Sequence, residues 1–77
     1  MNKQRRKRMA TAVEMIKKYT EELRDVLDEE TEYRDNVPEN LQGSERYEES
    51  EAICDALDSA IMDLDSAIDS LDEISLA

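Results

Sequence analysis

The 77-residue sequence contains no His, Trp or Phe, and only one Gly, one Pro and one Cys. Without His, the chain lacks the side chain that moves protons near neutral pH and the commonest nitrogen ligand of metal ions. A single Cys cannot form an internal disulfide or a Cys-x-x-Cys metal site. These absences exclude a His-dependent catalytic triad, and we expect a protein that is not an enzyme and that binds no cofactor or metal ion.

Basic side chains are missing from the whole C-terminal part of the chain. Residues 47–77 hold ten acids and no Lys or Arg after Arg46, whereas residues 1–8 hold five bases and no acid. The net charge is −11, so the chain is an electrical dipole with a negative excess. This charge repels nucleic acid at long range, so we expect a protein partner rather than direct nucleic-acid binding. The basic segment has two interpretations, a nucleic-acid arm or a counter-charge for the acidic end of the chain, and we favour the second.

Long apolar runs are absent as well. No four apolar residues follow one another, whereas a membrane helix needs about 20. The basic start resembles the beginning of a secretion signal, but Glu14, Lys17 and Lys18 interrupt the apolar stretch that such a signal requires. We therefore expect a cytoplasmic protein without a membrane segment.

Apolar residues recur every seven positions in both halves of the sequence, which predicts two long helices packed lengthwise. In the first half the columns are Met9, Ile16, Leu23; Val13, Leu27; and Ala12, Tyr19, Val26, Tyr33. In the second half they are Ile53, Ala60, Ala67, Ile74; Ser50, Leu57, Leu64, Leu71; and Tyr47, Cys54, Ile61, Ile68. We therefore expect Cys54 to be a small core residue rather than a reactive thiol.

The only Pro and the only Gly lie between the two halves. Pro38 pushes Val37 out of helical conformation and can start a short helical turn. We expect Gly43 to end that turn in a left-handed conformation and Ser44 to cap the second helix. The prediction is one all-α domain over residues 1–77, an antiparallel two-helix hairpin with helices over about 3–35 and 45–75 and a joint over about 36–44. Four residues are expected to seal the joint: Tyr33, Val37, Leu41 and Tyr47.

Folding the helices antiparallel is expected to bring the basic residues 3–8 beside the acidic residues 69–73, which relieves unfavourable helix dipoles at that end. The apolar stripes are about 160° wide, at 100° per residue, and two helices cannot cover both. We therefore expect a homodimer that forms a four-helix bundle.

The joint sequence Val37-Pro-Glu-Asn-Leu-Gln-Gly-Ser-Glu-Arg-Tyr-Glu48, followed by a helix rich in Asp, Ala, Ile and Leu, resembles a pattern in small acidic uncharacterised helical proteins of bacterial genomes and their phages or mobile elements. The resemblance covers about half of the chain. It implies a helical hairpin from a mobile element, and it carries over no site residues.

One flank of the second helix forms an acidic seam beside the apolar stripe. Its members are Glu51, Asp55, Asp58, Met62, Asp65, Asp69 and Asp72. Successive carboxylates stand about 5 Å apart at 1.5 Å per residue, which is comparable to the phosphate spacing of a nucleic-acid strand. The seam has two interpretations, a decoy for the Lys/Arg groove of a nucleic-acid-handling protein or a solvated helix face.

A second set of acids surrounds the joint. This acidic joint comprises Glu29, Glu30, Glu32, Asp35, Glu39, Glu45, Glu48 and Glu49. With Asp28 and Glu51 nearby, these acids meet only Arg24, Arg34 and Arg46. We expect a strongly negative end of the molecule.

Three functions compete on these features. The leading hypothesis is a phage or mobile-element inhibitor that binds a basic groove of a host nucleic-acid-handling defence protein by mimicking nucleic acid. The alternatives are a structural or regulatory module that binds a partner helix through its apolar stripe, and a small DNA-associated regulator that uses the basic N-terminus.

Overall fold

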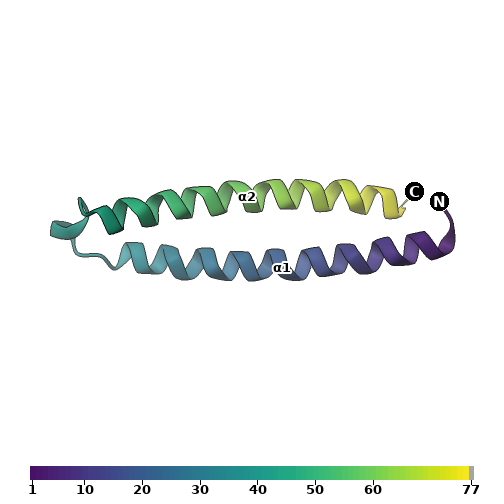
Figure 1. Cartoon of the computed structure of the whole chain (residues 1–77), viewed down its shortest axis with the longest axis horizontal. Helices are drawn as coiled ribbons and strands as arrows, with labels where there is room; N and C mark the ends of the chain where they lie inside the picture. The colour runs from purple at the N-terminus through teal and green to yellow at the C-terminus, as the bar shows by residue number, and fades with distance from the viewer. Residues whose placement is uncertain (77) are drawn as a thin grey trace.

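Two long antiparallel helices joined by one short turn make up the molecule (Figure 1). The computed structural model describes the backbone of residues 1–76 and the side chains of residues 1–74. Helix α1 spans Lys3–Asp35, the 3-10 turn η1 spans Glu39–Leu41, and helix α2 spans Glu45–Leu76. The chain forms a rod of 60 × 15 × 15 Å. The predicted all-α hairpin is confirmed, with helix limits within one residue of those expected.

Local hydrogen bonds explain where α1 begins and ends. The side-chain oxygen of Asn2 accepts a bond from the backbone N–H of Arg5 at 2.8 Å and so caps the first turn. At the other end the N–H of Val37 donates to the carbonyl of Arg34 at 3.2 Å, which tightens the last turn. The helix ends there because Pro38 restricts the residue before it to extended conformations.

Ser44 starts α2 as predicted. Its hydroxyl oxygen accepts a hydrogen bond from the N–H of Tyr47 at 3.3 Å, and its carbonyl accepts one from the N–H of Glu48 at 3.1 Å. Pro38 precedes η1, and its carbonyl accepts a bond from the N–H of Leu41 at 2.8 Å. The joint is therefore held by hydrogen bonds between near neighbours in the sequence.

The prediction for Gly43 was wrong, because this residue has no positive φ. The turn continues in right-handed geometry instead: Gln42 has φ −69° and ψ −16°, and the N–H of Ser44 donates to the carbonyl of Leu41 at 3.1 Å. A Cβ added at Gly43 would meet no heavy atom within 4 Å. Neither backbone conformation nor space therefore requires a glycine here.

The core is a narrow strip along the line where α1 and α2 meet. Among the described side chains its buried apolar members are Val13, Cys54, Ile61 and Ile68. Cys54 is thus a core residue, as predicted. Two polar side chains are equally buried and have hydrogen-bond partners: the Thr20 hydroxyl donates to the carbonyl of Ile16 at 2.7 Å, and the Ser50 hydroxyl donates to the carboxylate of Glu30 at 2.7 Å. The second bond joins the two helices.

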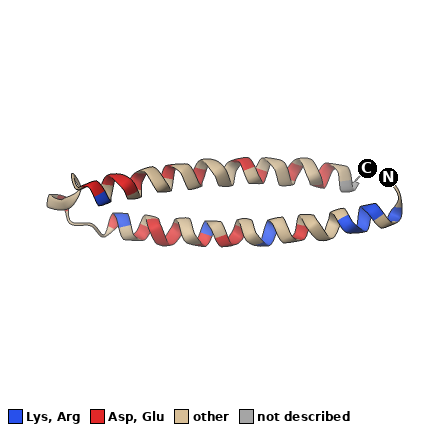
Figure 2. Ribbon diagram, in the orientation of Figure 1, with Lys and Arg blue, Asp and Glu red and all other residues tan. Residues whose placement is uncertain are grey.

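The expected contact between residues 3–8 and residues 69–73 was wrong in register. Asp72 instead pairs with Lys17, at 3.2 Å between Nζ and Oδ2. Lys17 lies nine residues after Arg8, about 13 Å along the helix axis. Within residues 1–74 no ion pair joins the basic segment to an acid. Figure 2 shows this segment as the blue start of α1.

Neither α1 nor α2 contains a stretch both long and apolar enough to span a bilayer, judged over residues 1–76.

Replacing Gly43 by Ala is expected to stabilise the hairpin by about 0.4–1 kcal/mol, because Ala restricts the unfolded chain and fits the observed backbone without strain. Urea unfolding followed by circular dichroism measures the change. The same experiment on Asn40→Ala, a substitution in the same turn that removes no glycine, is the control. A loss of stability for Gly43→Ala would show that the turn does require a left-handed residue.

Candidate protein-binding surfaces

The two edges of the core strip differ in chemistry. Along one edge, Asp72 of α2 pairs with Lys17 of α1, and Asp65 pairs with Arg24, which also pairs with Glu21. Along the other edge the neighbouring columns of both helices are apolar, and Leu23 and Leu64 lie half-buried there. The hairpin therefore has a charged side and an apolar side.

The apolar side is exposed over most of its length, as the width of the stripes predicted. We define the apolar face by its exposed members: Ala12, Met15, Ile16, Tyr19, Val26, Ile53, Ala60, Ala67 and Ile74. Tyr19 is 58% exposed, and the ring lies beside Ile16, Leu23 and Leu64 around a shallow hollow. An exposed face this long is uncommon on a monomer, which makes it a candidate contact surface.

The acidic seam is divided by the fold. Asp65 and Asp72 turn toward α1 and form the two ion pairs already described, and their side chains are 46% and 43% exposed. The hydrogen bond with Asp65 raises the pKa of Arg24 above its usual value, although partial burial opposes this, so the guanidinium stays charged. These two carboxylates thus serve the contact between the helices.

The remaining members of the seam face outward. Glu51, Asp55, Asp58 and Asp69 are exposed, and no ion pair of the described part of the chain includes them. Met62 is 63% exposed among them. The outward row is therefore sparser than one carboxylate per 5 Å, because the fold uses two of the six seam acids, Asp65 and Asp72, in ion pairs with α1.

The acidic joint stays mostly exposed, and acids are dense where the helices approach the joint (Figure 2). Glu30 is half-buried by its bond with Ser50, and Asp35 lies 3.5 Å from Nε of Arg34. Asp35 is exposed as well but paired, whereas the other six are exposed and form no ion pair within residues 1–74: Glu29, Glu32, Glu39, Glu45, Glu48 and Glu49. This end of the rod carries the densest negative charge of the molecule.

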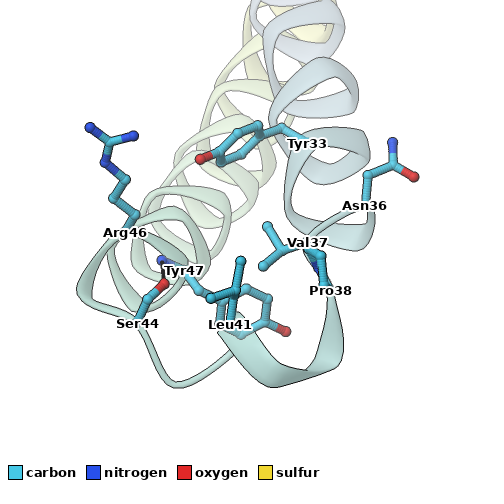
Figure 3. A pocket seen from close by; sticks show the side chains of 8 residues that line it. All are labelled: Tyr33, Asn36, Val37, Pro38, Leu41, Ser44, Arg46 and Tyr47. Carbon is cyan, nitrogen blue, oxygen red and sulfur yellow. Dashed lines mark hydrogen bonds between the residues drawn. The ribbon is translucent and has the colours of Figure 1, made fainter.

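The four residues expected to seal the joint do converge, but they leave it open (Figure 3). Val37 and Tyr47 are half-buried, whereas Tyr33 and Leu41 are each 51% exposed. Together with Arg46 they line an open, mainly apolar hollow. Tyr and Arg are enriched among the residues that dominate binding energy at protein interfaces. Sequence reasoning placed these residues at the joint but missed that they form an open surface.

The structure groups no three His, Cys, Asp or Glu side chains that could hold a metal ion within residues 1–76. The Cys54 thiol is buried, 3.8 Å from the hydroxyl of Thr31. Nothing in this arrangement resembles a reactive site.

Comparison of the chain with protein-family models, with curated proteins and with solved structures finds no match. The assignment of function therefore depends on the geometry of the surfaces.

Salt is expected to stabilise the fold, because screening weakens the repulsion among the six exposed acids of the joint. The side chains in the ion pairs of Lys17 and Arg24 are 35–46% exposed, and salt screens such partly buried pairs less than fully exposed charges. From about 0.02 to about 0.5 M NaCl we expect the melting temperature to rise by about 4 °C or more, which corresponds to about 1 kcal/mol.

Thermal unfolding at fixed protein concentration measures this effect. The control is a variant with Glu29, Glu32 and Glu49 changed to Gln, which should melt higher in low salt and respond less to added salt. A melting temperature independent of salt in both proteins would show that the acidic joint does not oppose folding.

Proposed function

We propose that this chain is a non-catalytic binding protein that engages a basic protein surface with the charged side of the hairpin. The observation that supports this most is the exposed acid distribution. Four seam carboxylates and six joint carboxylates face outward, and α2 has no base after Arg46 to neutralise them. An ordinary soluble helix gains stability by alternating Glu and Lys at four-residue spacing, and α2 lacks this pattern.

The sign and the extent of the exposed charge suit a groove that normally holds nucleic acid, although the outward carboxylates are spaced more widely than phosphates. The exposed acids extend from the joint along one side of a rod 60 Å long, so a partner can contact several at once. Each exposed pair contributes only about 0–1 kcal/mol, but many pairs also attract a basic partner at long range and speed association. Met62, exposed within the seam, adds an apolar contact to an otherwise charged surface.

The partner class follows from this chemistry. A nucleic-acid-handling protein has a Lys/Arg groove that this row of carboxylates occupies as a phosphate backbone does. The resemblance of the joint motif to small acidic proteins of phages and mobile elements supports a host defence protein as the target, with inhibition as the outcome.

A second candidate function uses the apolar face. Its exposed members, with Tyr19 the largest, form the groove-binding surface that a structural or regulatory module needs to bind a partner helix. Salt separates the two candidates. Binding through carboxylates weakens steeply as ionic strength rises, whereas binding through the apolar face persists.

The test uses the full chain as bait in a lysate, identification of the captured protein by mass spectrometry, and titration of that purified protein. Changing Asp55, Asp58 and Asp69 to Lys is expected to weaken binding by about 100-fold, at about 1 kcal/mol for each reversed charge. Lys is a better helix former than Asp, and these positions are exposed, so the hairpin should still fold.

The matched control changes Glu22, Asp25 and Asp28 to Lys. These acids are exposed on α1, and the net charge changes by the same amount. Equal weakening by both variants would show that only net charge matters and would refute recognition by the seam. An affinity that neither variant nor added salt changes would favour binding through the apolar face instead.

A further inference from the structure

We infer that the apolar face is covered by a second copy of this chain, which runs in the opposite direction so that the joint of each copy lies beside the termini of the other. This goes beyond the proposed function, because it concerns the opposite side of the hairpin. The seam carboxylates and the apolar face can therefore be occupied at the same time.

The size of the side that carries the apolar face fits this occupant. The hairpin measures 60 Å by 15 Å, so a copy aligned along the whole side covers about 900 Å², of which the apolar face, between Ile53 and Ile74, makes up about half at 1.5 Å per residue. Stable interfaces between two proteins bury about 800 Å² per partner. The face is also two helices wide, since α1 contributes Tyr19 and Val26 and α2 contributes Ala60 and Ala67. A second hairpin covers both rows, whereas a single partner helix covers only the groove between them.

A four-helix bundle completes the packing that two helices leave unfinished. Stacking two hairpins face to face would bury Tyr19, Val26 and Ile53 and leave the charged side in water. With the copies reversed, α1 packs on α1 and α2 packs on α2, so each helix still has only antiparallel neighbours. The column of Ala60 and Ala67 lets the two copies of α2 approach closely.

A dimer with both joints at the same end would also give each helix only antiparallel neighbours. Helix direction therefore does not distinguish the two dimers, and charge decides between them. Around the joint, residues 24–51 hold eleven acids and three bases, which gives −8. The other end has seven bases (Lys3, Arg5, Arg6, Lys7, Arg8, Lys17, Lys18) and four acids (Glu14, Asp69, Asp72, Glu73), which gives +3. Packed helices lie 8–10 Å apart, close to the screening length of about 8 Å at physiological salt.

Two joints side by side would therefore repel each other strongly, whereas the reversed copy places a basic end beside each acidic joint. This also gives residues 3–8 an acidic neighbour. Within one hairpin they form no ion pair with any described acid.

The first measurement is sedimentation equilibrium of the full chain. A mass of about 17.8 kDa, twice the 8.9 kDa of one chain, is expected at micromolar concentration. A mass of 8.9 kDa up to about 100 µM would overturn the inference. Ala60→Glu should weaken dimerisation at least about tenfold, because symmetry buries two unpaired carboxylates. Ala52→Glu, the same change at an exposed position of α2 outside the apolar face, should leave the dimer unchanged.

The second measurement is the distance between spin labels on Gln42→Cys in a Cys54→Ala background, taken under conditions where sedimentation shows this variant to be dimeric. Gln42 is exposed at the joint, so reversed copies place the two labels about one rod length apart, near 60 Å. A label distance of about 20 Å or less would overturn the reversed arrangement. If the chain is monomeric but the Asp55, Asp58 and Asp69 variant still loses its basic partner, the dimer is refuted and the proposed function stands.

Discussion

Two helices touch along a single line, and this limits how much of the chain can be buried. The hairpin buries four apolar side chains among those described, and the rest of each apolar stripe is half-buried or exposed. Thr20 and Ser50 lie in the same strip, and their hydroxyls are accommodated only because each has a hydrogen-bond partner. The ion pairs at one edge and the exposed apolar face at the other both result from this narrow contact. A chain of this length gains modest stability from such a core.

The fold was predictable where the signals are local. Pro38 and Ser44 fixed the ends of the helices because each acts on its immediate neighbours, and the seven-residue spacing placed Cys54 in the core. Gly43 shows the limit of such reasoning. A glycine permits a left-handed conformation without requiring one, and the bond between Ser44 and Leu41 selected a right-handed turn.

The sequence predicted where the residues of the candidate surfaces lie on each helix, but not which residues of the other helix they contact. Sequence reasoning placed Asp65 and Asp72 on one flank of the second helix, yet it could not show that they would meet Arg24 and Lys17. That outcome depends on the register between the helices, which is a relation between distant residues. The acidic seam is therefore one row in the sequence, but the structure divides it into two acids that pair with α1 and a remainder that faces outward.

The repeat within α2 has a consequence for how that register is chosen. Leu57-Asp-Ser-Ala-Ile and Leu64-Asp-Ser-Ala-Ile are identical, so a slide of α2 by seven residues would offer Arg24 another Asp and the core another Ile. The middle of the interface cannot distinguish the two alignments. Ser44 and the turn at Pro38, together with the bond between Ser50 and Glu30, fix the alignment from one end. The joint therefore sets the register of every other contact between the two helices.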